Sequence, residues 1–407
     1  MRLLTPQPSS IRNLHILIIP SWYPANPTDL NGCFFREQSL SLKKHGHEVG
    51  VIDVKLRLPR SWRLLFNGFF GSVTEVDEGL LTYRFCGFDW FRRSPRLRRW
   101  LWLRYGMKVV EQYLAEQGKP DVIHAHATFH GGELAKSVSQ KFAIPFVIAE
   151  HSSAFARGQV SKQKIEIARD VATSAIRRFA VSGKFCNLLE LLFDDALPWE
   201  EMPNMVEQRF IDSELSEQDW TIEPFIFLTV ALLTENKSVH NLVSAFARAF
   251  GDNPNVILRI GGDGKELTRL EKLAFELNVT DRVVFLGKLS RNQVCEEMSN
   301  SSVFVLPSSY ETFGVVVIEA LALGRPVIAT RCGGPESIVR KQDGLLVPIN
   351  DVPALAAAMV KMRSGNFVYD AEEIRAACIE RFSGSTIAKR LTNVYSEVIA
   401  VNSGTVD

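Results

Sequence analysis

Apolar residues recur along the first half of the chain in short runs, and segments with helical spacing lie between them. The runs have the length of buried strands, and the segments between them place apolar residues three and four positions apart. Strands that alternate with helices predict a parallel sheet covered on both faces. The predicted strands are 16–19, 48–54, 121–126, 144–149 and 178–182, and the predicted helices are 34–45, 132–141 and 161–177.

The same alternation restarts after Pro224, across a predicted linker at 203–219. Two α/β domains in series are therefore expected, each with a ligand-binding edge at the carboxyl ends of its strands. The last predicted helix, 386–401, carries an apolar stripe that indicates burial. The second set of strands is 225–232, 256–260, 283–286, 303–306 and 326–329, with helices at 239–250, 265–277, 293–299 and 319–323.

Composition agrees with two packed domains, since 407 residues with 46% hydrophobic content can form two cores. The net charge of +1 does not favour a nucleic-acid partner. Six scattered cysteines without a C-x-x-C spacing indicate reduced thiols in a cytosolic protein. No apolar run approaches the roughly 20 residues of a membrane-spanning helix. Residues 1–12 are expected to form a flexible tail.

The most specific segment follows the predicted strand 303–306. Strand, loop and helix in that order suit a phosphate, because the first amides of a helix are unpaired donors at the positive end of its dipole. Gly314 removes the side chain where a phosphate would approach. Glu311 and Glu319 lie eight positions apart. If the residues between them are helical, they are separated by roughly 12 Å, enough to hold two ends of one sugar nucleotide.

This segment resembles the E-x7-E signature of retaining GT-B glycosyltransferases of the family 4 kind. The likeness covers most of the chain, because further segments follow in the family's order. They are the first loop at 20–38, Ala149-Glu150-His151-Ser152, Pro203-Asn204-Met205-Val206, Gly261-Gly262-Asp263-Gly264, Phe285-Leu286-Gly287-Lys288 and Gly333-Gly334-Pro335-Glu336.

The resemblance implies an α/β GT-B architecture, in which two Rossmann-like, doubly wound parallel-sheet domains face a cleft. A C-terminal helix then crosses back to the first domain. On this basis the N-terminal, acceptor-binding domain comprises 13–205 and 385–407, and the C-terminal, nucleotide-sugar-binding domain comprises 206–384. The resemblance also implies transfer with retention of configuration and without a metal. No cofactor is expected, because the nucleotide sugar is itself a substrate.

The resemblance assigns roles to the residues of the signature. Glu311 looks like the carboxylate that holds the hydroxyls of the donor sugar. Glu319 looks like the carboxylate that accepts hydrogen bonds from the ribose hydroxyl pair. Gly314, Val315 and Val316 offer helix amides to the diphosphate.

Further donor-site positions follow from the same resemblance. Gly32, in the first loop, would bring backbone amides to the diphosphate, and Gly287 and Lys288 lie on the loop along which the base extends. His151 matches a histidine near the reacting sugar, where a neutral imidazole could hydrogen-bond the sugar or the leaving phosphate. Taken alone, Gly32 also fits an ordinary turn, and His151 also fits a hydrogen-bonded histidine at the end of a strand.

Two positions depart from the family pattern. The family carries R-x4-K after the first strand of its second domain, and Lys237 matches the lysine. Leu232 stands at the arginine, and Ser238 replaces the glycine that usually follows the lysine. Loss of one fixed charge from a diphosphate site costs on the order of 10²–10³ in rate. Arg331 is the candidate substitute, and Arg259 is less suited because it lies inside a strand.

His124 and His126 share one face of a predicted strand, which is a possible metal pair. No third ligand has a supporting spacing, and the family works without a metal. We therefore expect no metal.

A basic and aromatic stretch occupies residues 55–108, where twelve Lys or Arg stand against four Asp or Glu. Its densest part, 90–104, contains no acid. Tryptophan beside arginine suits an anionic membrane surface or a lipid-linked acceptor. The alternatives are a nucleic-acid patch, which this fold disfavours, and core packing with solvated arginines. We expect peripheral attachment at the cytoplasmic face of the inner membrane.

The predicted function is transfer of a sugar from a UDP- or GDP-sugar to a glycan or lipid-linked acceptor, in cell-surface polysaccharide biosynthesis. Two alternatives stay open. One is a non-catalytic nucleotide-sugar-binding subunit of a polysaccharide assembly, which Leu232 favours. The other is a GT-B sugar-nucleotide epimerase. The E-x7-E pair and the first loop favour transfer, and the absence of G-x-G-x-x-G after a first strand disfavours a dinucleotide oxidoreductase.

Overall fold

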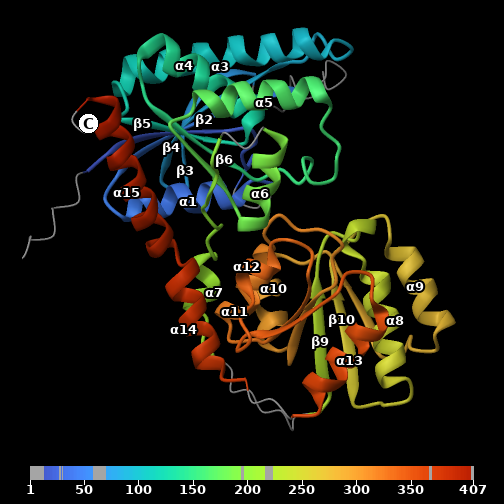
Figure 1. Cartoon of the computed structure of the whole chain (residues 1–407). Helices are drawn as coiled ribbons and strands as arrows, with labels where there is room; N and C mark the ends of the chain where they lie inside the picture. The colour runs from blue at the N-terminus through green and yellow to red at the C-terminus, as the bar shows by residue number, and fades with distance from the viewer. Residues whose placement is uncertain are drawn as a thin grey trace, which may run out of the picture. The chain divides into compact units, whose positions relative to one another are not determined.

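The computed structural model of the chain divides into two α/β units (Figure 1). Unit 1 contains residues 1–150, 161–179 and 388–407, and unit 2 contains residues 151–160 and 180–387. The expected tail at 1–12 and the part of the basic stretch at 58–69 lie outside the described residues. The structure describes residues 13–26, 29, 31–57, 70–193, 197–215, 223–365 and 369–404.

Unit 1 is organised around the first sheet, whose strand order is β3-β4-β2-β1-β5-β6-β7-β8. The central strand β1 pairs in parallel with β2 and β5, and it is buried from its second residue onward because both faces are covered. The strands of this sheet are β1 His15–Pro20, β2 Glu48–Arg57, β3 Gly71–Asp77, β4 Leu80–Phe88, β5 Val122–His126, β6 Phe146–Glu150, β7 Arg177–Ala180 and β8 Glu200–Glu201, of which β8 is counted by its residues in unit 2.

The first sheet is mixed, which corrects the expectation of a purely parallel sheet. β3 runs antiparallel to β4, and the hairpin turns at Glu78 and Gly79. Both residues have positive φ, at 49° and 97°, as a two-residue type I′ turn requires. The sequence pattern missed this hairpin because β3 is largely exposed and therefore lacks an apolar run.

The helices of unit 1 include one that the sequence pattern missed, α3, because arginines crowd its first turns. Its later residues are buried, and Trp102 donates from its indole nitrogen to the carbonyl of Val54 at 3.1 Å. The helices are α1 Cys33–Lys44, α3 Pro95–Gln117, the short π-helix Thr128–Gly132, α4 Glu133–Phe142 and α5 Lys162–Ser174, together with α15 Gly384–Asn402 from Ala388 onward.

The C-terminal helix α15 packs on unit 1, as expected. His47 Nε2 lies 2.7 Å from Thr392 Oγ1, and His124 Nδ1 lies 2.6 Å from Tyr395 OH. Both histidines come from the N-terminal part of the chain, so the polypeptide returns to its first domain at its end. The crossing helix of the GT-B architecture is therefore confirmed.

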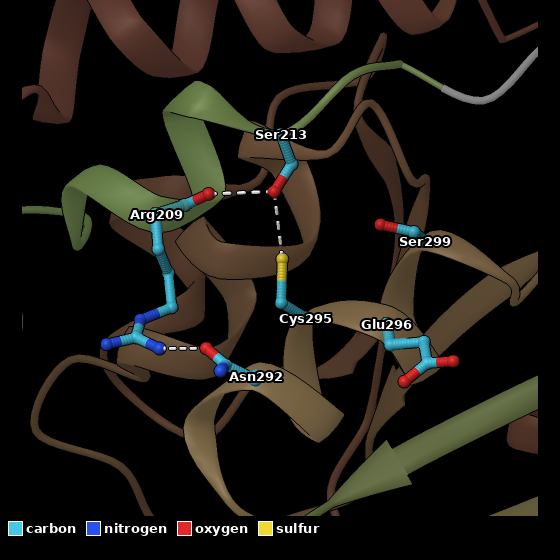
Figure 2. Close-up of a pocket in the computed structure, with 6 residues that line it drawn as sticks. All are labelled: Arg209, Ser213, Asn292, Cys295, Glu296 and Ser299. Atoms are coloured by element: carbon cyan, nitrogen blue, oxygen red, sulfur yellow. Dashed lines mark hydrogen bonds between the residues drawn. The ribbon is translucent and has the colours of Figure 1, made fainter.

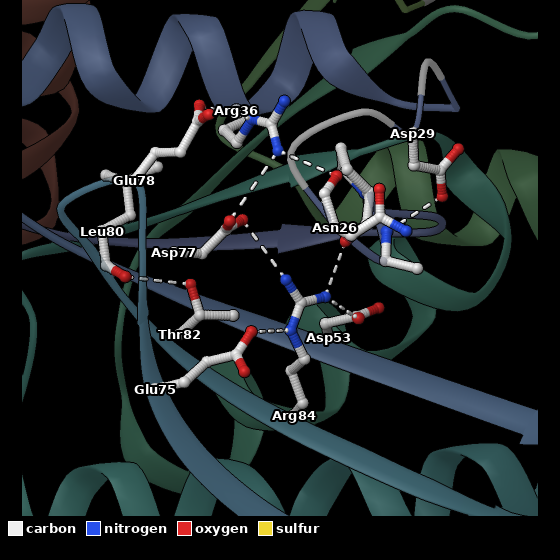
Figure 3. Close-up of polar contacts among 12 residues, drawn as sticks. Asn26, Asp29, Arg36, Asp53, Glu75, Asp77, Glu78, Leu80, Thr82 and Arg84 are labelled. Atoms are coloured by element: carbon white, nitrogen blue, oxygen red, sulfur yellow. Dashed lines mark hydrogen bonds and ion pairs between the residues drawn. The ribbon is translucent and has the colours of Figure 1, made fainter. Parts of the chain in front are cut away.

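A cluster of buried charges ties the first loop of unit 1 to its sheet (Figure 3). Arg84, on β4, donates from Nη1 to Asp53 Oδ2 at 2.6 Å and to the carbonyl of Pro24 at 2.7 Å. Arg36, on α1, donates from Nη1 to the carbonyl of Asn26 at 3.2 Å. Two arginines thus hold the backbone of the loop that precedes Gly32.

Unit 2 is built on a parallel sheet with the order β11-β10-β9-β12-β13-β14. The order runs outward from β9 in one direction and from β12 in the other. The loops after β9 and β12 therefore diverge, and the gap between them is where doubly wound folds bind ligands. The strands are β9 Phe225–Val230, β10 Val256–Gly261, β11 Val283–Gly287, β12 Val303–Leu306, β13 Val327–Thr330 and β14 Gly344–Val347.

Most helices of unit 2 alternate with the strands of its sheet, and α6 and α7 precede the first of those strands. Within the described part of the chain, none of the helices combines the length and the apolar character that a membrane span requires. The helix after β12 begins at Val315, four residues before the predicted start, because Gly314 supplies its left-handed cap. The helices are α6 Gly183–Leu192, α7 Gln208–Asp212, α8 Val239–Phe250, α9 Leu267–Glu276, α10 Arg291–Ser299, α11 Val315–Ala322, α12 Pro335–Ile338, α13 Val352–Arg363 and α14 Ala371–Phe382.

Candidate active site

The loops after β9 and β12 bring Lys237 and Glu311 together at the switch point of the second sheet. Lys237 Nζ lies 2.6 Å from Glu311 Oε1, and Ser308 Oγ donates to the same oxygen at 2.7 Å. The two loops are also joined through the Ser309 amide, which donates to the Asn236 carbonyl at 2.8 Å. A cation and a carboxylate that lie 74 positions apart in sequence thus share one small site.

The backbone of Glu311 is held by the glycine pair after β13. The Glu311 amide donates to the Cys332 carbonyl at 3.0 Å, and the Gly334 amide donates to the Glu311 carbonyl at 2.9 Å. A Cβ atom on Gly333 would lie 2.6 Å from the Glu311 carbonyl oxygen, and one on Gly334 would lie 2.0 Å from that of Phe313. The two backbones can approach this closely only because both positions are glycine.

Gly314 is the residue from which α11 starts. Its φ of 99° is left-handed, and a Cβ atom there would have no heavy atom nearer than 3.5 Å. The position therefore needs glycine for its backbone conformation, whereas an added Cβ atom would make only ordinary contacts with its neighbours. The first helical residues, Val315 and Val316, place their amides at this end of α11, where a helix offers unpaired donors.

Glu319, on α11, is almost fully buried, with 2% of its side chain exposed. Its Oε1 lies 2.5 Å from Nη2 of Arg291, and that guanidinium also binds Glu207 at 2.8 Å. Sequence reasoning missed Arg291 and Glu207, because neither belongs to a segment that carries the family resemblance. Only the packing of α10 against α11 reveals the contact.

The other sequence-predicted residues of unit 2 lie on loops around the same sheet edge. Gly287 ends β11 with φ at 66°, and Lys288 follows it as an exposed residue. Leu232 lies beyond the end of β9, with 66% of its surface exposed. Arg331 is exposed after β13, whereas Arg259 inside β10 forms an ion pair with Glu297 at 2.9 Å. The loop position of Leu232 would suit the arginine that the family pattern carries there.

In unit 1, the predicted Gly32 is confined by its surroundings. It precedes α1 with φ at 82°, and a Cβ atom would lie 2.9 Å from a ring carbon of Trp22. Glu150, in the family-like segment 149–152, is fully buried and accepts hydrogen bonds from the amide and the hydroxyl of Thr128, both at 2.8 Å. His151 follows directly, is half-buried, and belongs to unit 2.

His124 and His126 line one face of β5, with ring centroids 4.2 Å apart. Burial lowers the pKa of His124 to about 3, so the ring is neutral near pH 7. The described residues contain no group of three or more His, Cys, Asp or Glu side chains placed to hold a metal ion. His124 instead serves as a buried hydrogen-bonding partner of Tyr395.

A polar pocket of about 310 Å³ lies between α7 and α10 (Figure 2). Arg209, from α7, donates to Asn292 Oδ1 on α10, and Ser213 Oγ lies 3.1 Å from Cys295 Sγ. These contacts hold α7 against the first turns of α10, next to the Arg291 that binds Glu319. The lining residues are Arg209, Ser213, Asn292, Cys295, Glu296 and Ser299.

Two protein-family models match the chain in separate segments. The model for glycosyl transferases group 1 matches residues 212–381, and the model for a glycosyl transferase 4-like domain matches residues 34–189. Together with the switch-point site, these matches define the class of protein as a glycosyltransferase with the GT-B fold. The chain belongs to the glycosyltransferases, with the group 1 domain in unit 2.

Three known proteins illustrate the similarity. The putative teichuronic acid biosynthesis glycosyltransferase TuaC of Bacillus subtilis is 26% identical over 95% of this chain and 99% of its own length. The sucrose-phosphate synthase of Thermosynechococcus elongatus superposes with a TM-score of 0.75 at 21% identity, over 95% of this chain and all of its own. HepE of Anabaena, solved in complex with UDP, has a TM-score of 0.71 at 19% identity, over 94% and 100%.

Proposed function

We propose that the protein transfers a sugar from a UDP- or GDP-sugar to a glycan or lipid-linked acceptor, with retention of configuration and without a metal. The observation that carries this proposal is the 2.6 Å contact between Lys237 and Glu311 at the switch point of the second sheet. A cation and a sugar-orienting carboxylate are the two groups that transfer from a diphosphate donor requires at one place.

The chemistry follows from the charges of the site. When the bond between the sugar and the diphosphate breaks, negative charge develops on the leaving phosphate. Lys237 and the first amides of α11 would stabilise that charge in place of a metal ion. Glu311 would accept hydrogen bonds from the sugar hydroxyls, and Glu319 would accept them from the ribose.

The names of the related proteins agree with this proposal. HepE was solved in complex with UDP, which supports a nucleotide donor, and TuaC is described as a putative enzyme of teichuronic acid biosynthesis, which supports a glycan acceptor. A second candidate is a non-catalytic nucleotide-sugar-binding subunit. Leu232 favours it, because a leucine on the loop after β9 supplies no charge to the diphosphate.

We also propose that unit 1 associates with anionic membranes through the start of α3. Trp90, Leu97 and Trp100 are 62%, 47% and 51% exposed, although exposed apolar side chains of this size favour burial. The exposed side chains of Arg92 and Arg96 accompany them. The structure corrects the predicted patch at Trp102, which is 6% exposed and belongs to the core. Co-sedimentation with phosphatidylglycerol vesicles tests this, and binding that does not weaken with salt would contradict it.

The transfer proposal is tested by release of UDP and GDP from a panel of their sugars in the presence of EDTA. We expect slow hydrolysis of one donor by the native protein and its loss in Glu311→Gln, which keeps the shape but removes the charge. Glu297→Gln is the matched control, because Glu297 also forms an ion pair within unit 2, with Arg259. Donor binding without turnover, even with lipid acceptors, would favour the non-catalytic subunit.

A further inference from the structure

Arg291 lies between two carboxylates of unit 2. Its Nε and Nη2 lie 2.8 Å from Glu207 Oε2, and Nη2 also lies 2.5 Å from Glu319 Oε1. Its Nη1 approaches Glu319 Oε2 more loosely, at 3.4 Å. The guanidinium therefore holds one oxygen of Glu319 closely and leaves most of the accepting capacity of the other oxygen for a further donor.

Several contacts fix Arg291 before any ligand is considered. Arg291 is the first residue of α10, and a capping box between Ser290 and Gln293 sets the conformation of that turn. The guanidinium lies over the ring of Phe210, 4.9 Å from its centroid. Glu207, which it binds on the other side, also accepts from Arg209. A cation held in this way has little freedom to follow a moving carboxylate, so it determines where the carboxylate stays.

Charge balance explains why Glu319 can be buried as an anion. An ionised carboxylate with 2% exposure requires a partner, because desolvation disfavours its charge. Burial opposes the charge on Arg291 as well, but Glu319 and Glu207 outweigh it and raise the pKa of Arg291 above its ordinary value. The guanidinium therefore keeps its positive charge beside the two carboxylates.

The place of Arg291 in the sequence gives this pair a geometric consequence. Gly287 and Lys288, the loop assigned to the base, precede Arg291 by four and three positions. In a nucleotide the base and the ribose are joined by one bond, so a site must hold both at a set spacing. The contact between Arg291 and Glu319 links α10, which follows the base loop, to α11, which carries the carboxylate assigned to the ribose.

We infer that Arg291 is a positioning residue that holds Glu319 against the base loop and thereby makes the donor site select ribose over 2′-deoxyribose. This inference rests on the proposed function, in which Glu319 accepts from the ribose hydroxyls. Glu207 acts as the counter-charge that keeps the guanidinium in place. A carboxylate held in one orientation rejects a sugar that lacks the hydroxyl, because its lone pair is then left unmatched.

The experiment compares binding of UDP with 2′-deoxy-UDP, and of GDP with 2′-deoxy-GDP, by calorimetry. For the preferred base, the native protein should bind the ribonucleotide about 10- to 100-fold more tightly, as expected for a hydrogen bond to a charged group. Arg291→Met should reduce this ratio to within about twofold of that in Glu319→Gln. Arg291→Lys, which keeps the charge but loses the planar fork, should give an intermediate ratio.

Arg340→Met is the matched control. Arg340 binds Asp343, whose side chain is also 2% exposed, at 2.7 Å, so its removal likewise strands a buried carboxylate of unit 2. The control should lower the melting temperature and keep the native ratio. If Arg291→Met fails to fold, the ratio of ribonucleotide to deoxyribonucleotide affinity in Arg291→Lys tests the inference instead.

Failure of the inference about Arg291 can be distinguished from failure of the proposed function. A native ratio retained in both Arg291 variants, while Glu319→Gln loses it, would overturn the inference and leave the proposed function standing. A native protein that binds no nucleotide, or that binds ribose and deoxyribose forms equally, would overturn the proposed role of Glu319 and the inference with it.

Discussion

Lys237 Nζ and Glu311 Oε1 lie 2.6 Å apart, on loops that follow neighbouring strands of the second sheet. The pair is partly accessible, with 24% of the lysine side chain and 13% of the glutamate side chain exposed. Both side chains are therefore open in part to a ligand from solvent. The predictions below begin with this pair.

Lys237→Met should lower kcat/KM for the donor by about 10²–10³, because the leaving diphosphate loses a fixed positive charge. The measurement is donor turnover at several donor concentrations. Lys272→Met is the control, since Lys272 is 76% exposed on α9 and forms an exposed pair with Glu276. A loss of kcat/KM smaller than tenfold in Lys237→Met would contradict the role assigned to this lysine.

Leu232→Arg should raise turnover by about tenfold or more, because it would place a guanidinium on the loop that precedes Lys237. Leu232 is 66% exposed, so the substitution should change the free energy of unfolding by less than about 0.5 kcal/mol. Leu232→Gln adds a polar side chain without a charge, and it should leave turnover unchanged. An equal gain in both variants would show that charge at this position is not the limiting feature.

Gly314→Ala should lower the free energy of unfolding by about 1–2 kcal/mol, because φ at 99° is unfavourable for a residue with a Cβ atom. It should also weaken donor binding, because the added methyl group lies where a phosphate would approach α11. Gly365→Ala is matched in backbone conformation, since Gly365 also has positive φ, at 68°, and an added Cβ atom there would meet no heavy atom within 4 Å. Urea unfolding should show similar losses for the two variants, and only Gly314→Ala should change binding.

His124 should make stability fall with acid. Its pKa is about 3 in the folded protein against an ordinary value of 6.5, because burial disfavours the charged ring. Stability is therefore complete above pH 6.5 and is lost as the pH falls toward 3, since only the unfolded chain takes up the proton. At pH 5 the loss amounts to about 2 kcal/mol. His124→Asn should reduce the dependence of urea unfolding on pH between 7 and 5, and an unchanged dependence would contradict this assignment.

Arg84→Met should destabilise unit 1 by about 3 kcal/mol, because it removes the guanidinium from Asp53, whose side chain is 3% exposed. The loss is at the low end for a broken buried pair because Lys55 still lies 3.2 Å from Asp53. Arg84→Lys should recover part of this loss by supplying a charge without the planar fork. The control is Lys141→Met, which breaks an exposed pair with Glu111 and should cost no more than about 1 kcal/mol. Denaturant unfolding of the three variants checks the order.

Much of the fold was predictable because apolar runs and helical spacing are local properties. The strands β1, β5, β9, β10, β11 and β12 appear close to their predicted positions, since each is a short apolar run. The core buries most of these residues, although the edge strand β11 is only partly covered. The hairpin β3–β4 and the helix α3 were missed for the opposite reason. β3 mostly faces solvent and the first turns of α3 carry arginines, so neither shows a continuous apolar run. β4 is mostly buried, and its place in the sheet depends on its pairing with the remote strand β2.

The candidate site divides in the same way. Glu311, Gly314 and Glu319 could be found from sequence because their chemistry and spacing occur within one segment of strand, loop and helix. Lys237 could be found only through the family resemblance, and the structure places it against Glu311. Arg291 and Glu207 had no signal, because their role depends on a contact between α10, α11 and the loop before α7.

The sequence by itself determined the alternation of strands and helices, the two α/β units and the segment with the two carboxylates, because spacing and residue type are sufficient for local structure. Tertiary structure alone decided which cation holds which carboxylate. Lys237 binds Glu311 and Arg291 binds Glu319, although lysines and arginines are spread along the whole chain. The physical reason is that an ion pair depends on a distance of about 3–4 Å, and only the packed sheet and helices set such distances between remote residues.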